Sequence, residues 1–243
     1  MKKFNYVVAC WAGDRRRKDP AYDADKTFYI KAQLKQLTKL KHSLDQITFV
    51  VNDAPEQAEF VKYLNRMPDN LNGVPIIVLH RPNIGMSYGA WAHTYEKYGR
   101  EFENYIIMED DYMPCIDNFD TELFDMMIDK KVDYLCSVYT DHAACAGGIM
   151  YSQTIQAIYA QGKTLPYDKG KTPNYSKTEV QGQVGISRVF TDLGYKVADY
   201  LSKYNMVFET IYDGPAQYKI VGDPEKPPLM IPVNYLKELG EDL

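Results

Sequence analysis

The sequence predicts an α/β fold in which a mostly parallel, mixed sheet is flanked by helices on both faces. Segments with strand and helix patterns alternate through the first two thirds of the chain. The 243 residues, 45% hydrophobic and 25% charged, are enough to bury the core of a soluble globular protein. We expect one domain over residues 1–243, with an extended proline-rich tail from about residue 223.

The first fifty residues contain both a strand pattern and a helix pattern. An apolar, β-branched run predicts a first strand over residues 4–10. Residues 26–40 repeat apolar side chains at helical spacing, with lysines facing outward. A second strand is expected over 47–51, after which Asp53 and Glu56 have the spacing of a capping box at a helix start.

The middle of the chain continues the alternation. A third strand is expected over residues 74–79, before the turn-rich segment 80–85. A helix with a buried aromatic face follows, because apolar residues recur there at helical spacing. These residues are Tyr88, Trp91, Ala92, Tyr95 and Tyr98. Beyond the next strand, which ends near Glu109, a helix is expected over about 118–131.

The last third is less regular. Strands are expected over residues 132–138 and 148–151, and a helix over 152–160. Residues 161–177 are rich in Gly, Pro, Lys and Asn, which is typical of a mobile loop or lid. A further helix, from about residue 180, should stop at the glycine of Leu193-Gly194.

Three consecutive carboxylates, Glu109, Asp110 and Asp111, end the short apolar run that begins at Tyr105. Ligands of open α/β sheets bind at the carboxyl ends of the strands, and carboxylates are hard ligands suited to Mg or Mn. A cation would also relieve the repulsion among three like charges. The sequence therefore predicts a divalent-cation site, with a solvated acidic turn or a helix cap as the alternative. Three more candidate binding residues follow strands at this edge: Trp11, Asp53 and Arg81.

Composition excludes several classes of protein. The net charge of -5 leaves no broad basic surface for nucleic acid, although Arg15 to Lys18 could meet a phosphate. The 21 tyrosines suit surfaces that stack on bases or sugars, or else a core built with Tyr in place of Phe. The cysteines have no zinc-site spacing and are expected to be reduced, buried thiols. They are Cys10, Cys115, Cys136 and Cys145.

No run is long enough for a transmembrane helix, and Met1-Lys2-Lys3 leads into a strand without a signal-peptide core. We therefore expect a cytoplasmic protein. Its oligomeric state cannot be inferred from the sequence.

The order of these motifs resembles nucleotide-sugar-dependent glycosyltransferases of the GT-A fold. The resemblance covers roughly residues 4–195 and is carried by three segments: Phe49 to Asp53, Arg81 to Gly85, and Ile106 to Asp111. Family 2 glycosyltransferases are the nearest general comparison. The Glu-Asp-Asp triplet is similar to the metal motif of N-acetylglucosaminyltransferase I.

The resemblance implies a Mn or Mg cofactor and a nucleotide-diphosphate sugar as donor. Asp111 would be the last acid of the DxD-type motif and the principal metal ligand. Glu109 would assist it, and Glu109 and Asp110 would hold metal-bound water or the donor ribose. A divalent cation that bridges the two phosphates stabilises the charge that develops on the leaving group.

Four other positions match donor-binding positions of the family. Asp53 would hydrogen-bond the base or ribose, or merely cap the following helix. Arg81 would approach the nucleotide, or lie at the surface. Gly85 would allow a close approach to the ligand, or form an ordinary turn before a helix. Trp11 would stack on the nucleobase, or close the edge of the core.

The acceptor side departs from the family pattern. Gly147 and Gly148 resemble a strand that lines the acceptor cleft, with a tight turn as the alternative. Arg188 and Gly194-Tyr195 match a family Arg and Gly-Tyr pair. The positions where an inverting enzyme has its Glu-Asp pair read Gln181-Gly182.

Two carboxylates compete for the role of catalytic base. Glu179 would serve if the alignment slips by two residues, although a helix start would also favour its charge. Asp141 is the second candidate, and its neighbour His142 is either an acid/base group or an ordinary loop residue. If neither carboxylate reaches the acceptor, retaining chemistry or loss of activity is expected.

The sequence therefore predicts a metal-dependent glycosyltransferase, inverting if its base is present, that acts on a carbohydrate or another hydroxyl acceptor. A sugar-phosphate nucleotidyltransferase is one alternative, but its loop should be rich in glycine and this one has only Gly13. A non-catalytic nucleotide-sugar or carbohydrate-binding protein is the other.

Overall fold

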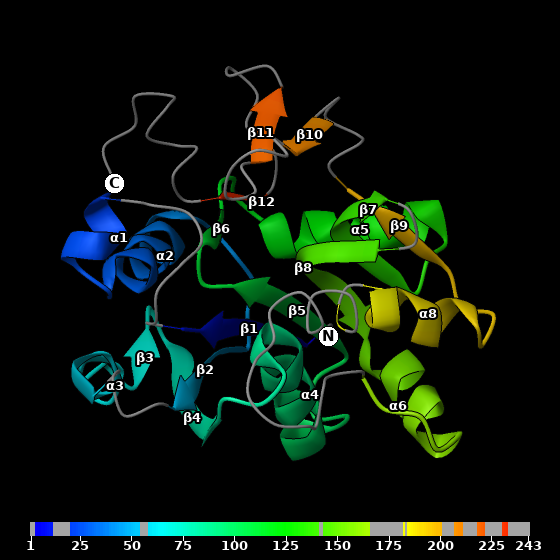
Figure 1. Ribbon diagram of the computed structural model, residues 1–243, viewed down its shortest axis with the longest axis horizontal. Helices are drawn as coiled ribbons and strands as arrows, with labels where there is room; N and C mark the ends of the chain where they lie inside the picture. Colours follow the sequence, from blue (N-terminus) through cyan, green and yellow to red (C-terminus); the bar gives the residue numbers. More distant parts are fainter. Residues whose placement is uncertain are drawn as a thin grey trace.

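The computed structural model describes residues 3–11, 20–53, 58–140, 143–165, 182, 184–200, 207–210, 218–221 and 230–232. Its main sheet has eight strands in the order β3-β4-β2-β1-β5-β8-β7-β9 (Figure 1). Two small sheets are formed by β10 (Val207–Thr210) with β11 (Tyr218–Val221), and by β6 (Tyr112–Pro114) with β12 (Met230–Pro232). The predicted mostly parallel, mixed sheet is confirmed.

Four neighbouring strands of the main sheet are parallel, so their carboxyl ends lie at one edge. They are β4 (Val74–Pro82), β2 (Gln46–Asp53), β1 (Phe4–Cys10) and β5 (Asn104–Glu109). The first strand has the predicted bounds. The third is longer than expected, because the pairing of β2 with β4 continues to Asp53 and Pro82. Arg81 therefore lies in a strand and not in the loop after it.

The other strands complete the two sides of the sheet. β3 (Asn70–Leu71) is antiparallel to β4, and β9 (Val197–Asp199) is parallel to β7 (Tyr134–Thr140). β8 (Ala143–Tyr151) lies between β5 and β7 and is antiparallel to both. The prediction that this strand begins at Gly148 was wrong. It begins at Ala143 because it pairs with β7 from Thr140 onward.

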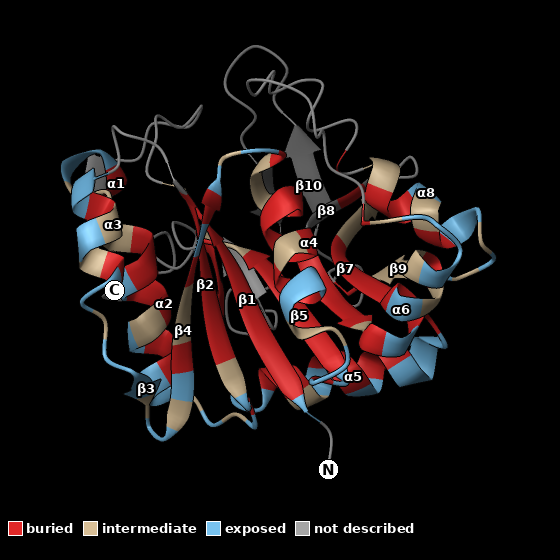
Figure 2. Cartoon of the chain, turned by 90° about the horizontal axis from the view of Figure 1, so that it is seen from below, coloured by how far each residue is buried: buried red, intermediate tan, exposed pale blue. Residues whose placement is uncertain are grey.

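Helices cover both faces of the sheet, as expected (Figure 1). On the first face lie α1 (Pro20–Ala24), α2 (Phe28–Lys39), α3 (Ala58–Leu64) and α5 (Phe119–Lys130). On the second face lie α4 (Met86–Tyr98), α6 (Ser152–Ala160) and α8 (Gly185–Thr191). Figure 2 shows the buried strands between these two helical layers.

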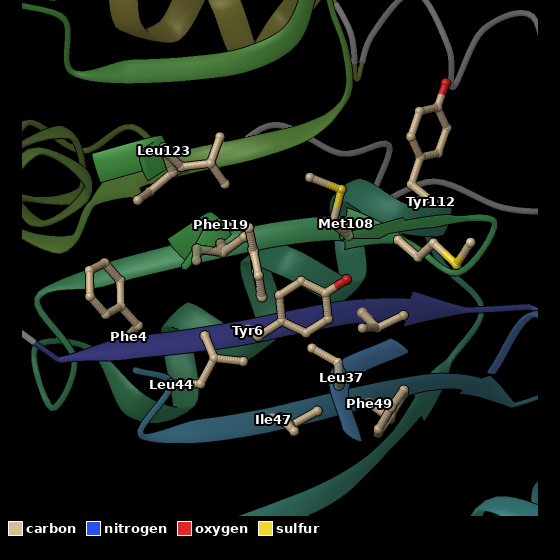
Figure 3. Packing of buried hydrophobic residues seen from close by; sticks show 14 of the residues in the cluster. Phe4, Tyr6, Leu37, Leu44, Ile47, Phe49, Met108, Tyr112, Phe119 and Leu123 are labelled. Carbon is tan, nitrogen blue, oxygen red and sulfur yellow. The ribbon is translucent and has the colours of Figure 1, made fainter. Parts of the chain in front are cut away.

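The strands are hydrophobic on both sides, because each side is covered by helices. In β1, Phe4, Tyr6 and Val8 face the first layer, whereas Val7 and Ala9 face the second. Figure 3 shows the first face, where side chains of β1, β2 and β5 lie with Leu37 of α2 and Phe119 of α5. Burial of each large apolar side chain contributes about 1.5–3 kcal/mol.

Helix α2 begins two residues later than the predicted start at Lys26. The carboxylate of Asp25 accepts hydrogen bonds from the backbone N and the Oγ1 of Thr27, at 2.9 and 2.6 Å. The backbone N of Phe28 donates to the carbonyl of Asp25 at 2.9 Å. These bonds form a turn that competes with helix, as Asp commonly does.

Buried thiols and tyrosines follow the expectations from composition. Cys10 and Cys136 are buried free thiols, Cys115 is a half-buried one, and the side chain of Cys145 lies outside the described residues. Several tyrosines are among the largest fully buried side chains, which confirms a core built partly with Tyr: Tyr6, Tyr22, Tyr105, Tyr134 and Tyr200. Within the described segments, no helix is both long enough and apolar enough to cross a membrane.

Candidate functional site

The acidic triplet lies where the sequence predicts it, at the carboxyl edge of the sheet. Glu109 is the last residue of β5, and Asp110 and Asp111 form the turn into β6. β6 in turn pairs with β12, with Tyr112 opposite Pro232. A segment of the proline-rich tail thus supports the strand that follows the acids.

The middle acid is directed into the protein. Asp110 is only 3% exposed, and its Oδ2 accepts a hydrogen bond of 2.9 Å from the backbone N of Trp11. The backbone carbonyl of Asp110 accepts one of 2.7 Å from Nε2 of Gln33, which also reaches the carbonyl of Glu109 at 3.4 Å. The turn is therefore tied to the end of β1 and to α2.

The two flanking acids are half-buried. Glu109 lies on the α4 side of the sheet, where its Oε1 accepts a hydrogen bond of 2.8 Å from Oγ of Ser87. Asp111 lies in the turn itself, and its Oδ1 is buried.

The described residues hold no group of three His, Cys, Asp or Glu side chains arranged to bind a metal. Mg²⁺ in phosphate-transfer sites is usually bound by one or two carboxylates together with substrate phosphates and water. Glu109 and Asp111 supply two carboxylates of the hard-oxygen type that Mg and Mn prefer. This donor set fits a cation that is shared with a diphosphate substrate.

Arg81 and Asn52 form a buried pair at the same edge. They are partners on adjacent parallel strands, and Nη1 of Arg81 donates to Oδ1 of Asn52 at 2.5 Å. Nη2 of Arg81 donates to the backbone carbonyl of Ile84, also at 2.5 Å. Arg81 is 7% exposed, so the alternative of an ordinary surface arginine is excluded.

Two glycines shape the segment that Arg81 holds. Gly85 precedes α4 with φ 75°, a left-handed conformation that favours glycine, so the turn before a helix accounts for it. Gly89 packs under the segment: a Cβ there would lie 2.1 Å from the carbonyl oxygen of Ile84 and 2.6 Å from Nη2 of Arg81. The absence of a side chain at Gly89 allows this close contact.

His93 of α4 lies close enough to Arg81 to interact with it electrostatically. The pKa of His93 is lowered from its ordinary value, first by burial and then by the positive charge of Arg81. The imidazole is therefore held in its neutral form more strongly than in an unfolded chain.

Trp11 follows β1 directly and is half-buried. Besides the bond from its amide to Asp110, its carbonyl accepts a hydrogen bond of 3.1 Å from the hydroxyl of Tyr22. Both backbone groups are thus fixed. Asp53 ends β2 opposite Pro82, but its side chain lies outside the described residues. The capping-box partner Glu56 and the basic run Arg15 to Lys18 also lie outside them.

The glycines expected to line an acceptor cleft have another explanation. A Cβ at Gly147 would lie 2.0 Å from the carbonyl oxygen of Ile107, and one at Gly148 would lie 2.1 Å from that of Leu135. The space beside them is filled by the backbones of β5 and β7. Both glycines lie within β8, so close strand packing accounts for the absence of a side chain at these positions, and a tight turn does not.

Two of the three residues near α8 that match the family pattern, Gly194 and Tyr195, have roles in the turn and the packing after this helix. Arg188 is exposed, and Gly194 has φ 83° in the turn after the helix, as a glycine stop requires. Tyr195 packs edge-on against Phe190. Gly182 lies against Tyr88, because a Cβ there would be 2.2 Å from the ring. Three acceptor-side candidates, Asp141, His142 and Glu179, lie outside the described residues, as does most of the predicted loop over 161–177.

Three residues of this edge were not expected from the sequence: Asn52, Ser87 and Gln33. Asn52 could have been found, because it lies directly opposite Arg81 once the two strands are aligned. Ser87 resembles an ordinary residue of a first helical turn, and Gln33 a polar residue on an amphipathic helix. Only the tertiary structure shows that both are bonded to the acidic triplet.

The fold is that of the nucleotide-diphospho-sugar transferases. A mannosyltransferase from Pyrobaculum calidifontis, in complex with GDP-Man and Mn2+, aligns with a TM-score of 0.52 and 10% identity over 82% of this chain and 54% of that one. A cytidylyltransferase from Leptospira borgpetersenii aligns with a TM-score of 0.49 and 11% identity, over 92% of this chain and 82% of that one. A 4-diphosphocytidyl-2C-methyl-D-erythritol synthase from Anaerococcus prevotii aligns with a TM-score of 0.47 and 11% identity, over 82% of this chain and 86% of that one. No protein-family profile and no curated protein sequence matches the chain.

Proposed function

We propose that this chain is a metal-dependent glycosyltransferase that moves a sugar from a nucleotide-diphosphate donor to a carbohydrate or another hydroxyl acceptor. One observation carries the proposal. The carboxyl edge of four parallel strands holds two half-buried carboxylates, Glu109 and Asp111, together with the buried cation of Arg81. Such an edge is where open α/β sheets bind ligands.

On the donor side, Asp111 is the proposed principal ligand of Mn or Mg, and Glu109 assists it. The cation would stabilise negative charge on the departing nucleoside diphosphate. Ser87 holds the carboxylate of Glu109, and Arg81 adds a positive charge at the same edge. Trp11 and Asp53 are the proposed contacts to the base and ribose, and the turn at Gly85 is the proposed point of close approach to the donor.

On the acceptor side, the proposed base is Glu179 or Asp141, which would take the proton of the attacking hydroxyl. The proposed outcome is inversion at the sugar carbon. The proposed unit of activity is one domain, because β12 of the tail pairs with β6 directly beyond the acids.

The first experiment identifies the reaction. Thermal-shift measurements with a panel of nucleotide-diphosphate sugars, with and without Mn, should find a donor that raises the melting temperature only with the metal. The product is then analysed with an acceptor panel. Release of nucleoside diphosphate supports glycosyl transfer. Release of pyrophosphate from a nucleoside triphosphate and a sugar phosphate would instead identify a nucleotidyltransferase.

The second experiment tests the assigned ligand. Asp111→Asn keeps the size of the side chain and removes its charge, so metal-dependent turnover should be lost while the fold remains. The matched control is Asp129→Asn, because Asp129 is an exposed aspartate on α5. Full activity in the Asp111 variant, or equal loss in both variants, contradicts the assignment. Donor binding without turnover across the panel would favour a non-catalytic binding protein.

A further inference from the structure

We propose that Asp110 and Gln33 are positioning residues that lock the acidic turn, so that Glu109 and Asp111 are presented together to a cation. The inference rests on the proposed function. It assigns the middle acid a structural task in place of contact with metal-bound water or ribose. Glu109 and Asp111 would then bind the cation, and Asp110 would hold the turn in place.

The first half of the lock joins the turn to β1. The Asp110 carboxylate is buried and accepts the backbone N–H of Trp11, the first residue after β1, at 2.9 Å. A charge-assisted bond of this kind is stronger than a neutral one. Because β1 and β5 are neighbouring parallel strands, this hydrogen bond links the residues that follow their carboxyl ends.

The second half joins the turn to α2. Gln33 is 0% exposed, and its Nε2 donates to the carbonyls of Asp110 and Glu109. Its Oε1 accepts a hydrogen bond of 2.9 Å from the hydroxyl of Tyr6, so the amide cannot rotate without breaking bonds at both ends. The pKa of Tyr6 is raised well above its ordinary value, mainly by burial, so the hydroxyl stays protonated as the donor.

The Tyr6 ring is itself fixed. It is fully buried in β1 and packs edge-on against Phe119 of α5, with ring centroids 5.8 Å apart. A chain of contacts therefore runs from the core through Tyr6 and Gln33 to the backbone of the acids. Groups that orient metal ligands typically change metal affinity by about 10–100-fold when removed.

The first test separates an acceptor role from a ligand role at Asp110. Asp110→Asn retains an oxygen that can accept the Trp11 N–H, whereas Asp110→Ala does not. We expect the Asn variant to bind Mn, with nucleoside diphosphate present, within about 3-fold of the parent chain, and the Ala variant about 10–100-fold more weakly. Amide hydrogen exchange of Trp11 in the metal-free protein should accelerate much more in the Ala variant than in the Asn variant, which keeps a neutral hydrogen bond.

The second test addresses Gln33. Gln33→Met keeps the side-chain length and removes the hydrogen bonds, so Mn affinity should fall by about 10–100-fold. Gln36→Met is the matched control, because Gln36 is a buried glutamine one turn further along α2. The double variant Tyr6→Phe/Gln33→Met also removes the hydroxyl that Gln33→Met leaves without its acceptor. It should recover part of the urea midpoint lost in Gln33→Met, without recovering Mn affinity.

The outcomes separate this proposal from the proposed function. If Asp110→Asn loses Mn binding as completely as Asp111→Asn, Asp110 is a ligand and the lock is overturned. Unchanged Trp11 exchange in Asp110→Ala overturns it as well, whether or not metal binds. If the parent chain binds no Mn with any nucleoside diphosphate, the proposed function fails and the role of the lock in metal binding fails with it.

Discussion

Arg81 donates one hydrogen bond to the side chain of Asn52 and a second to the backbone of Ile84. The guanidinium thereby joins two adjacent strands to the turn that begins α4. Three residues after Ile84, the hydroxyl of Ser87 donates a hydrogen bond to the carboxylate of Glu109. The buried cation and the acidic triplet are thus connected through one short segment. Four predictions concern Arg81 and the residues that lie around it.

Arg81→Lys should destabilise the protein although the charge is kept. An ammonium group cannot form the same planar fork to two fixed acceptors. A buried Asn52 oxygen left without its bond should cost about 1–3 kcal/mol. Urea unfolding measures this. The control Arg100→Lys changes an exposed arginine and should stay within about 0.5 kcal/mol. Equal stability of the two variants would show that the fork has no special role.

Gly89→Ala should destabilise the protein although alanine favours helix. The new methyl group would meet the Ile84 carbonyl oxygen, which is backbone and must move. Overpacking typically costs about 1–3 kcal/mol, and a clash of 2.1 Å with backbone should fall in the upper part of that range, above the roughly 1 kcal/mol that alanine adds in a helix. The melting temperature and the affinity for the donor should both fall. A variant more stable than the parent chain, with unchanged donor affinity, would contradict the tight packing of this segment.

The free energy of unfolding should depend on pH through His93. An unfolded histidine binds its proton near pH 6.5, and the folded protein binds it at a lower pH. Between these values the unfolded state binds more protons, so stability rises with pH and is lost as the pH falls. Urea unfolding at several pH values should show this slope, and His93→Gln should flatten it.

The contribution of Arg81 to the pKa of His93 can be measured separately. In Arg81→Gln the positive charge is absent, so the pKa of His93, followed by NMR, should move upward toward its ordinary value. An unchanged or lower pKa would show that burial alone holds the imidazole neutral.

The sequence predicts elements whose stability is local or whose pattern is strong. The strand at residues 4–10 and the helix at about 118–131 are found almost as expected, because one is a largely apolar, β-branched segment and the other repeats apolar side chains at helical spacing. The extension of β8 back to Ala143 could not be predicted. Its first residues are small, and their strand conformation depends on pairing with β7.

The candidate site was predictable in part. The carboxyl edge and the acidic triplet follow from the order of strands. The partners of the acids do not, because Gln33 is 77 residues from Asp110 and only the packing of α2 brings them together. The pairing of β6 with the distant β12 is another such contact.

The most direct test of the central claim is the position of a cation. Crystals soaked with Mn and a nucleotide-diphosphate sugar should show an anomalous-scattering peak about 2.1 Å from a carboxylate oxygen of Asp111, with the diphosphate on its other side. The peak should be absent from Asp111→Asn crystals treated in the same way. A parent crystal that holds the nucleotide sugar with no peak at Asp111, or with the cation held by other residues, would contradict the account.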